Sequence, residues 1–468
     1  MAIPSIKLVK SNGWNSDLIK KYDVAGPRYT SYPTVPNFSS AFRQAEYLQQ
    51  IETSLKHSLA PLSLYVHVPF CKNICFYCGC NKIVTRDTSV ARKYLNYLEK
   101  EIRLQSAAIG NRRPVMQLHF GGGTPTFLDN AELTELMHAL ASHFKLTDAQ
   151  QREYSIELDP RTVTSDSLAL LRGLGFNRVS FGIQDFDLRV QKAINRVQSY
   201  QSVAELVSAA RLYRFRSVSF DLIYGLPFQT PESLSATIDQ VTKLSPDRIA
   251  FYNYAHLPER FSSQRAIDRL ALPSAEQKLS MWVQIAERLM AAGYQFIGMD
   301  HFVKVDDDLA KAQKAGRLQR NFQGYSTCLA PDLVGLGVSS ISSLQRCYAQ
   351  NERDLDGYYD RLARNELPVC RGVALSRDDE IRRAIISDVI CHLELDINRI
   401  EVRFNIDFSD YFSRVFPALL EMEIDGLLVI EGAKILVTAQ GRAMLRNICM
   451  LFDRYLSQDS PSAFSRSL

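Results

Sequence analysis

The sequence lacks three things: a strong net charge, a long apolar run, and a second cysteine pair to match its one cysteine-rich loop. A net charge of +4 over 468 residues argues against bulk binding of nucleic acid, although it leaves room for a local basic pocket. No apolar stretch is long enough to cross a bilayer. Lys7 and Lys10 lie near the start without the apolar core of a signal peptide behind them. We therefore expect a cytoplasmic protein that keeps its thiols reduced.

Signature motifs of several enzyme classes are missing as well. No Gly-x-Ser-x-Gly occurs, so nothing indicates an acyl hydrolase. None of the eight histidines pairs with another four residues away across a glutamate, which excludes the zinc-protease motif. His67 and His119 fall in predicted strands, and we expect them to be satisfied core residues rather than metal ligands.

What the sequence does have is four cysteines within ten residues: Cys71, Cys75, Cys78 and Cys80, directly after an apolar run at 62–68 that is typical of a strand. Three thiolates at this spacing can hold three irons of a [4Fe–4S] cluster and leave the fourth iron open to a substrate. Structural zinc usually takes four ligands from two separated pairs, and no second pair exists here. We expect a cluster on the first three cysteines, with Cys80 a neighbour rather than a fourth ligand.

The other five cysteines are scattered, and the total of nine is odd. This distribution does not favour a disulfide framework. We expect these residues to behave as small buried hydrophobes. They are Cys328, Cys347, Cys370, Cys391 and Cys449.

From the cysteine loop onward, apolar strand-like runs alternate with helix-like segments. Repeated strand and helix predict a parallel sheet with right-handed crossovers, but periodicity alone does not separate a partial barrel from an open doubly wound sheet. In a barrel, chemistry lies at the carboxyl ends of the strands, where the cysteine loop falls. The strands after the first are predicted at 115–120, 154–158, 178–181, 217–223 and 248–252, and the helices at 90–107, 131–144, 165–174, 202–213 and 231–244.

The sequence pattern changes beyond about Leu367, and a chain of this length is expected to hold two or three domains. Residues 367–468 suggest a small winged-helix-like domain, and because this part is not notably basic we expect a lid or packing role. We divide the chain into an arm (1–50), a barrel (51–300), a connecting extension (301–366) and a C-terminal domain (367–468). The later elements are predicted as helices at 281–292, 306–320, 378–393, 408–424 and 438–455, a strand at 294–299 and a hairpin at 426–437.

Polar residues end the predicted strands in turn. Glu157, Gln184 and Asp221 each lie in or just past an apolar run, and each one alone could simply cap a loop or pair with a cation. The run Gly121-Gly122-Gly123, without the Lys-Ser/Thr ending of a phosphate loop, could be a tight turn or a backbone cradle for a ligand. Arg196 could clamp a carboxylate or form a surface salt bridge. Taken together, these residues are typical of a barrel active site.

These features together resemble the radical S-adenosylmethionine enzymes and, among them, the oxygen-independent coproporphyrinogen III oxidases. The resemblance spans nearly the whole chain. It is carried by GPRYTSYPT at 26–34, CGCNK at 78–82, DLIYGLP at 221–227, YAHLP at 254–258, GMDHF at 298–302, RNFQGY at 320–325, GR at 441–442 and RNICM at 446–450.

A sister group of haem-chaperone-like proteins shares the cysteine triplet but lacks the fourth cysteine and carries a His-Asn-x-x-Tyr-Trp run. Here Cys80 is present and no His-Asn dipeptide occurs, which favours the oxidase. One departure is Tyr77, where the family often has Phe; the ring is kept and a hydroxyl is added.

The resemblance implies an α/β fold with a partial (β/α)6 barrel. It implies an oxidoreductase of haem and porphyrin biosynthesis that converts two propionates of coproporphyrinogen III to vinyls, giving protoporphyrinogen IX, through a 5′-deoxyadenosyl radical from S-adenosylmethionine. A flavodoxin or ferredoxin would donate electrons to a monomer that binds neither nucleic acid nor membrane. The alternatives are a haem-binding chaperone without oxidase activity, another radical enzyme such as a methyltransferase, or a zinc-stabilised regulator.

The resemblance also assigns residues. Cys71, Cys75 and Cys78 would ligate the [4Fe–4S] cluster. Arg28 is a candidate anchor for a substrate carboxylate, or else part of a structural arm. One S-adenosylmethionine would be held by Tyr65, Gly122, Gly123, Thr124, Glu157 and Arg196, and a second by Gln184, Asp221, Ala255 and Ile341. Tyr77 is expected to be a further cofactor-binding residue.

Overall fold

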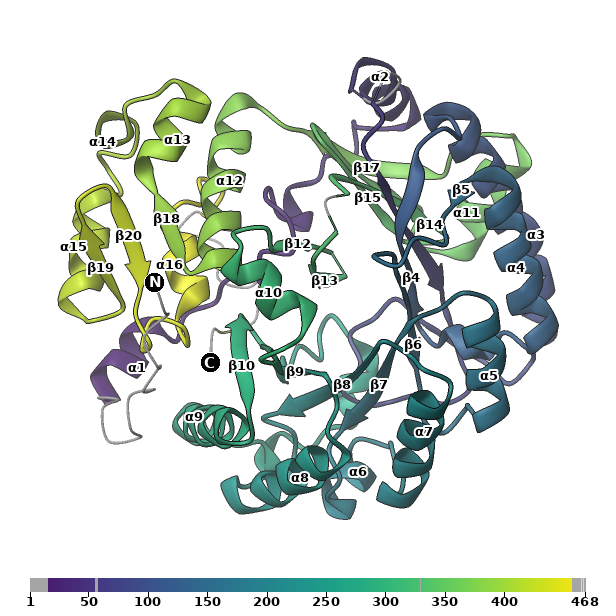
Figure 1. Ribbon diagram of the computed structural model, residues 1–468, viewed down its shortest axis with the longest axis horizontal. Coiled ribbons are helices and arrows are strands. Elements are labelled where there is room, and N and C mark those ends of the chain that lie inside the picture. Colours follow the sequence, from purple (N-terminus) through teal and green to yellow (C-terminus); the bar gives the residue numbers. More distant parts are fainter. Residues whose placement is uncertain (1–15, 55–57, 329, 457–463, 465, 467–468) are drawn as a thin grey trace.

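The computed structural model describes residues 16–54, 58–328, 330–456, 464 and 466. The expectation that residues 1–15 are not a signal peptide therefore falls outside the described residues. At its centre a sheet curves round on itself, with helices along its outer face (Figure 1). Six neighbouring strands of this sheet are parallel, which confirms the predicted partial barrel. In order across the sheet they are β1 (Leu62–Val68), β4 (Pro114–Gly122), β6 (Glu153–Leu158), β7 (Arg178–Gln184), β8 (Ser217–Tyr224) and β9 (Arg248–Asn253).

Alternate residues of the middle strands face the inside of the curve. On β6 and β8 the apolar residues are buried, whereas the residues between them are partly open. Because a strand sends successive side chains to opposite faces, these alternate residues face inward. They are polar or small. They line the barrel interior and are Ser155 and Glu157, Ser180 and Gly182, and Ser219 and Asp221.

The predicted crossover helices are all present. Several begin with a capping box, in which the N-cap side chain accepts from the third backbone N–H and the third side chain returns the bond. The N-caps are Asp129, Thr164, Thr230 and Ser274. The helices are α3 (Ser89–Ile109), α4 (Asn130–His143), α5 (Ser165–Gly173), α7 (Tyr200–Leu212), α8 (Pro231–Leu244) and α9 (Ala275–Ala291), with an unpredicted short α6 (Leu188–Ala193).

The sheet continues beyond the barrel at both edges. At one edge β14 (Asp332–Leu336) pairs parallel to β1, and β15 (Ile341–Leu344), β16 (Cys347–Asn351) and β17 (Val369–Ala374) follow antiparallel. At the other edge β11 (His301–Lys304) and the predicted strand β10 (Tyr294–Gly298) are antiparallel. The strands β14 to β17 were missed, because short segments such as Ile-Ser-Ser-Leu lack a clear alternation.

The predicted helix at 306–320 is only partly correct. It forms α10 (Asp308–Lys314), which ends where Gly316 takes a left-handed φ of +64°. The chain then forms β12 (Gln319–Asn321), paired with β13 (Gly324–Ser326).

The C-terminal part contains the predicted hairpin, but two of its predicted helices were too long. The helix at 408–424 is divided into α14 (Phe408–Tyr411) and α15 (Phe416–Ile424), since Pro417 favours a new helix start over continuation of the old one. The helix at 438–455 shrinks to α16 (Leu445–Met450) between turns. The remaining elements are α12 (Arg377–His392), β18 (Glu394–Asp396), α13 (Ile397–Phe404), β19 (Leu428–Glu431) and β20 (Lys434–Val437).

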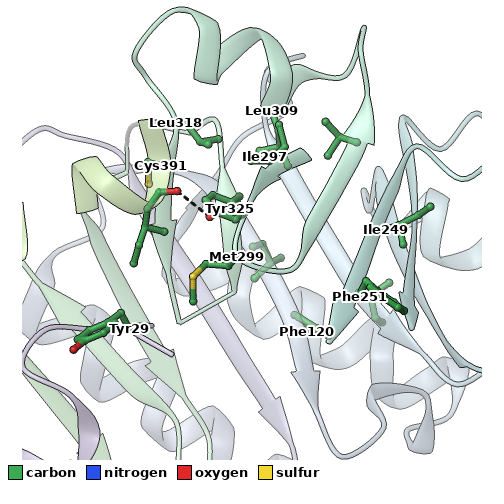
Figure 2. Packing of buried hydrophobic residues seen from close by; sticks show 14 of the residues in the cluster. Tyr29, Phe120, Ile249, Phe251, Ile297, Met299, Leu309, Leu318, Tyr325 and Cys391 are labelled. Atoms are coloured by element: carbon green, nitrogen blue, oxygen red, sulfur yellow. Dashed lines mark hydrogen bonds between the residues drawn. The ribbon is translucent and has the colours of Figure 1, made fainter. Parts of the chain in front are cut away.

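Buried apolar residues join this C-terminal part to the barrel. Figure 2 shows Met299, Tyr325 and Cys391 converging where β10 and β13 meet α12. The Tyr325 hydroxyl donates to the Ile390 carbonyl at 3.1 Å. The N-terminal helix α1 (Ser16–Tyr22) lies against the same C-terminal part (Figure 1). In the described part of the chain, no helix is both long and apolar enough to cross a membrane.

Candidate functional site

A cavity of about 420 Å³ lies inside the barrel. It extends from the cysteine loop along the inward residues of β6, β7 and β8 to Arg178 and Arg248, at the amino ends of their strands. The barrel mouth and its interior are therefore one continuous space.

The cysteine loop forms the wall of this cavity at the carboxyl end of β1. Cys71 ends the short strand β2 (Phe70–Cys71), which pairs with β3 (Ile83–Val84), and Cys75, Cys78 and Cys80 follow in the turn. All four line the cavity and none is in a disulfide. A hydrogen bond from the Cys80 thiol lowers the pKa of Cys78, which places Cys80 beside that ligand candidate.

Each of the three predicted ligand sulfurs accepts a hydrogen bond from the protein. Such outer contacts orient metal-bound ligands and stabilise the thiolate form. The Thr124 hydroxyl donates to Cys71 Sγ at 3.4 Å, and the Cys80 backbone amide donates to Cys78 Sγ at 3.4 Å. Cys75 Sγ accepts from Arg196 Nη1 at 3.5 Å and from Arg161 Nη2 at 3.6 Å.

The arrangement fits a cluster better than a single ion. Among the described residues, no group of three or more Cys, His, Asp or Glu could hold one metal ion. A cubane cluster places each thiolate on its own iron, so its ligands should border a cavity rather than meet at a point. Cys71, Cys75 and Cys78 do border the cavity, and a four-ligand zinc centre does not fit them.

The glycine run packs tightly against the cysteine loop and the cavity wall. A Cβ on Gly123 would lie 2.6 Å from the Pro69 carbonyl oxygen, and one on Gly122 would lie 2.8 Å from the His67 ring. A Cβ on Gly121 would lie 3.0 Å from the Glu157 carboxylate. These glycines are thus required by the protein's own close packing, besides any contact with a ligand.

Glu157 faces the cavity with 45% of its side chain exposed. Its partner is His119, whose Nε2 lies 3.0 Å from Glu157 Oε1, rather than the Arg or Lys that its sequence position left open. The other ring nitrogen of His119 lies 2.6 Å from the Ser155 hydroxyl. His67 is likewise hydrogen-bonded, to Tyr65 and to the Asn81 carbonyl. Both histidines are satisfied as expected, but His119 also lines the cavity.

Gln184 and Asp221 lie on neighbouring strands at an irregular point of the sheet. The register between β7 and β8 shifts between Gly182 and Gln184, and Gln184 has a left-handed φ of +66°. Such strain in a non-glycine residue persists only where the surroundings hold it, and it often marks a functional site. Burial, followed by the nearby Glu157 charge, raises the pKa of Asp221 to about 7, while Ser180 donates to it at 3.0 Å.

Arg196 is a buried residue of the cavity wall, not a surface salt bridge. Its side chain is 7% exposed, and Nη1 lies 3.2 Å from Asp159 Oδ2. Nη2 donates to the Gly182 carbonyl at 2.7 Å. Asp159 also accepts from Arg161, in the Asp-Pro-Arg segment just after β6. Sequence reasoning missed Asp159 and Arg161, although their position at the end of a strand was a usable signal.

Three predicted cofactor residues lie outside the cavity wall. Tyr65 stacks on His119 with ring centroids 5.8 Å apart. The Ala255 carbonyl accepts from Gln264, which also donates to the backbone of Tyr77, a wall residue. Ile341, on β15, packs against the small apolar cluster of Phe38, Tyr348 and Leu375.

Arg28 lies across the end of β9. Its Nη2 donates to the Asn253 carbonyl at 2.6 Å, and its guanidinium lies 6.0 Å from the ring centroid of Tyr252, a cavity residue. Its Nη1 lies 3.8 Å from Asp300. The side chain is 30% exposed.

Known protein families match both the barrel and the C-terminal part of this chain. The Radical SAM superfamily matches residues 65–241, and the HemN C-terminal domain matches residues 375–444. An oxygen-independent coproporphyrinogen III oxidase from Pseudomonas aeruginosa is 50% identical over 453 residues, 97% of this chain and 98% of that protein. One from Escherichia coli is 47% identical over 450 residues, 96% and 97% of the two chains. The solved structure of coproporphyrinogen III oxidase (HemN) from Escherichia coli, a radical SAM enzyme, matches with a TM-score of 0.89 and 46% identity over 95% of this chain and 99% of that one.

Proposed function

This chain belongs to the family of oxygen-independent coproporphyrinogen III oxidases, and on that premise we propose a role for each group at its site. It is a radical S-adenosylmethionine oxidoreductase that decarboxylates two propionates of coproporphyrinogen III to vinyl groups. Its cofactors are a [4Fe–4S] cluster and S-adenosylmethionine. One observation supports placing the cluster at this site: the sulfurs of three cysteines border one cavity, and the sequence has no second cysteine pair that could supply a fourth ligand.

Cys71, Cys75 and Cys78 ligate the cluster, and Cys80 remains a neighbour that donates to Cys78. When bound, the cluster and S-adenosylmethionine supply the one-electron chemistry that removes a hydrogen atom from a propionate side chain. The protein supplies orientation and dryness, since a reactive radical attacks any hydrogen within reach. Hydrogen bonds within the protein already hold the polar residues of the cavity wall, which favours a defined placement of S-adenosylmethionine and of the substrate.

The first S-adenosylmethionine is held at the mouth of the cavity. The Glu157 carboxylate, oriented by His119, accepts from ribose hydroxyls, because a carboxylate can accept two such bonds. Arg196 offers a guanidinium to the methionine carboxylate. Gly122, Gly123 and Thr124 provide backbone and hydroxyl groups, and Tyr65 supports the wall from behind through its stacking on His119.

A second S-adenosylmethionine is held beside Gln184 and Asp221. The strained Gln184 and the cavity-lining Asp221 support a polar ligand at this position. Ala255 lies behind the Tyr77 wall segment, and Ile341 lies on the β15 side. Because the pKa of Asp221 is raised to about 7, its carboxyl is about half protonated at pH 7, and the protonated form can donate to a ligand.

The remaining assignments concern the whole molecule. We propose a cytoplasmic monomer reduced by a flavodoxin or ferredoxin, with an arm, barrel, extension and C-terminal domain at 1–50, 51–300, 301–366 and 367–468. Nine cysteines without a disulfide suit a reducing compartment. The small net charge of +4 does not favour nucleic acid or a membrane surface as a partner.

An anaerobic turnover assay tests the function. Reconstituted protein with coproporphyrinogen III, dithionite and S-adenosylmethionine should form the divinyl product, identified by a mass loss of two formic acid equivalents. Cys75→Ala should abolish turnover, whereas Cys328→Ala, outside the loop, should retain it. A reconstituted protein that binds haem but forms no vinyl product would instead support the chaperone alternative.

A further inference from the structure

The three ligand sulfurs are not equivalent in their surroundings. Cys71 and Cys78 each accept from a neutral donor, a hydroxyl and a backbone amide. Cys75 instead accepts from two guanidinium groups, those of Arg161 and Arg196. Hydrogen bonds from charged donors are stronger than those from neutral ones. Lys82 places positive charge near Cys78 as well, so what sets Cys75 apart is that both of its donors are guanidinium groups.

One carboxylate binds both guanidiniums. Asp159 Oδ2 accepts from Arg161 Nη2 at 2.7 Å and lies 3.2 Å from Arg196 Nη1. Asp159 is 10% exposed and Arg196 is 7% exposed, so little water screens the group. Arg161 is held further by its Nε, which lies 3.0 Å from Asp159 Oδ1. The four groups Cys75, Asp159, Arg161 and Arg196 form one fixed unit, which we call the Cys75 clamp.

The three residues of the clamp that surround the Cys75 sulfur carry a net positive charge next to the cluster position. Two arginines and one aspartate leave one unit of positive charge beside the Cys75 sulfur. A reduced cluster has one more electron than the oxidised one and therefore one more negative charge. A nearby positive charge stabilises that reduced form and raises its potential, and hydrogen bonds to the sulfurs act in the same direction.

We propose that Asp159 and Arg161 are positioning residues that set the reduction potential of the cluster through the Cys75 sulfur and hold Arg196 in place. This inference depends on the proposed function, because it assumes a cluster on Cys75. It adds two residues to the site and predicts opposite effects for them. Loss of the Arg161 charge makes reduction harder, whereas loss of the Asp159 charge makes it easier.

The test measures midpoint potential rather than activity. Wild type, Arg161→Gln, Arg161→Lys and Asp159→Asn are reconstituted without air, their iron content is determined, and the cluster is titrated under EPR without S-adenosylmethionine. Arg161→Gln should lower the ratio of reduced to oxidised cluster at a fixed potential about tenfold, which is a shift of about 59 mV for one electron. Asp159→Asn should shift it in the opposite direction, and Arg161→Lys, which keeps the charge, should shift it least.

Lys192→Gln is the matched control, because Lys192 is an exposed cation on α6 near Arg196 without a contact to sulfur. Its potential should equal that of the wild type. The inference is overturned if Arg161→Gln and Asp159→Asn leave the potential unchanged, or if Lys192→Gln shifts it as much as Arg161→Gln. If the wild type itself holds no cluster, the proposed function fails as well, so the two failures are distinguishable.

Discussion

Gly182 shows how closely single residues are fitted around the clamp. It lies on β7, and its carbonyl accepts from both Arg196 Nη2 and Arg196 Nε. A Cβ at this position would lie 2.9 Å from Arg196 Nη2 and 2.9 Å from the Gln184 amide. The absence of a side chain at Gly182 therefore permits the positions of two proposed cofactor residues at once.

Replacement of Gly182 by alanine should displace Arg196 or Gln184. We expect Gly182→Ala to weaken S-adenosylmethionine binding by on the order of tenfold, the loss of about one hydrogen bond to a charged group. Calorimetric titration of the cluster-loaded protein measures this. Gly173→Ala is the control, since nothing lies within 4 Å of a Cβ there. Equal affinities for the two variants would contradict the fit described above.

A second prediction at this scale concerns Asp221. Burial raises the pKa of its carboxyl to about 7, so between its unfolded value near 3.8 and pH 7 the folded protein holds one more proton than the unfolded chain. Its contribution to the unfolding free energy must then fall as the pH rises through this range. Asp221→Asn removes the effect, so the variant should gain stability relative to the wild type as the pH rises from about 4 to about 7.

Urea unfolding of the ligand-free protein at several pH values checks this. The difference between variant and wild type isolates Asp221, since every other titrating group is shared. A difference that stays constant with pH, or that changes in the wild type's favour, would show that Asp221 keeps an ordinary pKa.

The sequence was sufficient to find polar residues such as Glu157 and Asp221, because a carboxylate in an apolar run is conspicuous. It could not supply their partners. His119 and Glu157 lie on neighbouring strands, and only the register of β4 against β6 brings them to 3.0 Å. The Asp159–Arg161 pair was missed for a different reason, since a charged pair in a loop is usually a solvated surface feature.

At the scale of elements, the repeating barrel was predictable and the additions to it were not. Each barrel strand is a long apolar run bounded by helices with capping residues, so local and tertiary preferences agree. The strands β14 to β17 instead depend on tertiary pairing. Besides the pairing of β14 with β1, a fully buried carboxyl, Glu101 of α3, joins them to the barrel.

Glu101 holds three segments of this extension. It accepts from the Tyr358 hydroxyl and the Asn351 amide, both at 2.6 Å, and from the Gly337 amide at 2.7 Å. Glu101→Ala would leave these buried donors unpaired and should lower the unfolding free energy by about 3 kcal/mol. Glu99→Ala, exposed on the same helix, should change it by no more than about 0.5 kcal/mol. Denaturant unfolding compares the two, and similar values would mean that the extension is held by other contacts.

At the scale of the whole molecule, the N-terminal arm connects the barrel to the C-terminal part. Tyr22 donates to Asp425 and Tyr29 donates to Asp453, which places the arm against the C-terminal elements. Between these contacts, Arg28 reaches the end of β9 beside the cavity. The motif at 26–34 pointed to this region, but only the folded chain shows that it joins distant parts.

This position makes Arg28 a candidate anchor for a substrate carboxylate. Arg28→Ala should raise the KM for coproporphyrinogen III roughly tenfold, a typical effect of losing one charge-assisted hydrogen bond, and should spare cleavage of S-adenosylmethionine. Steady-state assays of both reactions separate these effects. Arg43→Ala, further along the arm, is the control. An unchanged KM in Arg28→Ala would leave Arg28 a structural role only.

The account as a whole depends on a cluster held by three cysteines whose remaining iron is free to bind S-adenosylmethionine. The most direct test is the EPR spectrum of the reduced, reconstituted protein before and after S-adenosylmethionine is added. We predict that the spectrum of the cluster changes on addition, because the ligand binds to the iron itself. A spectrum that is identical with and without S-adenosylmethionine would contradict the account.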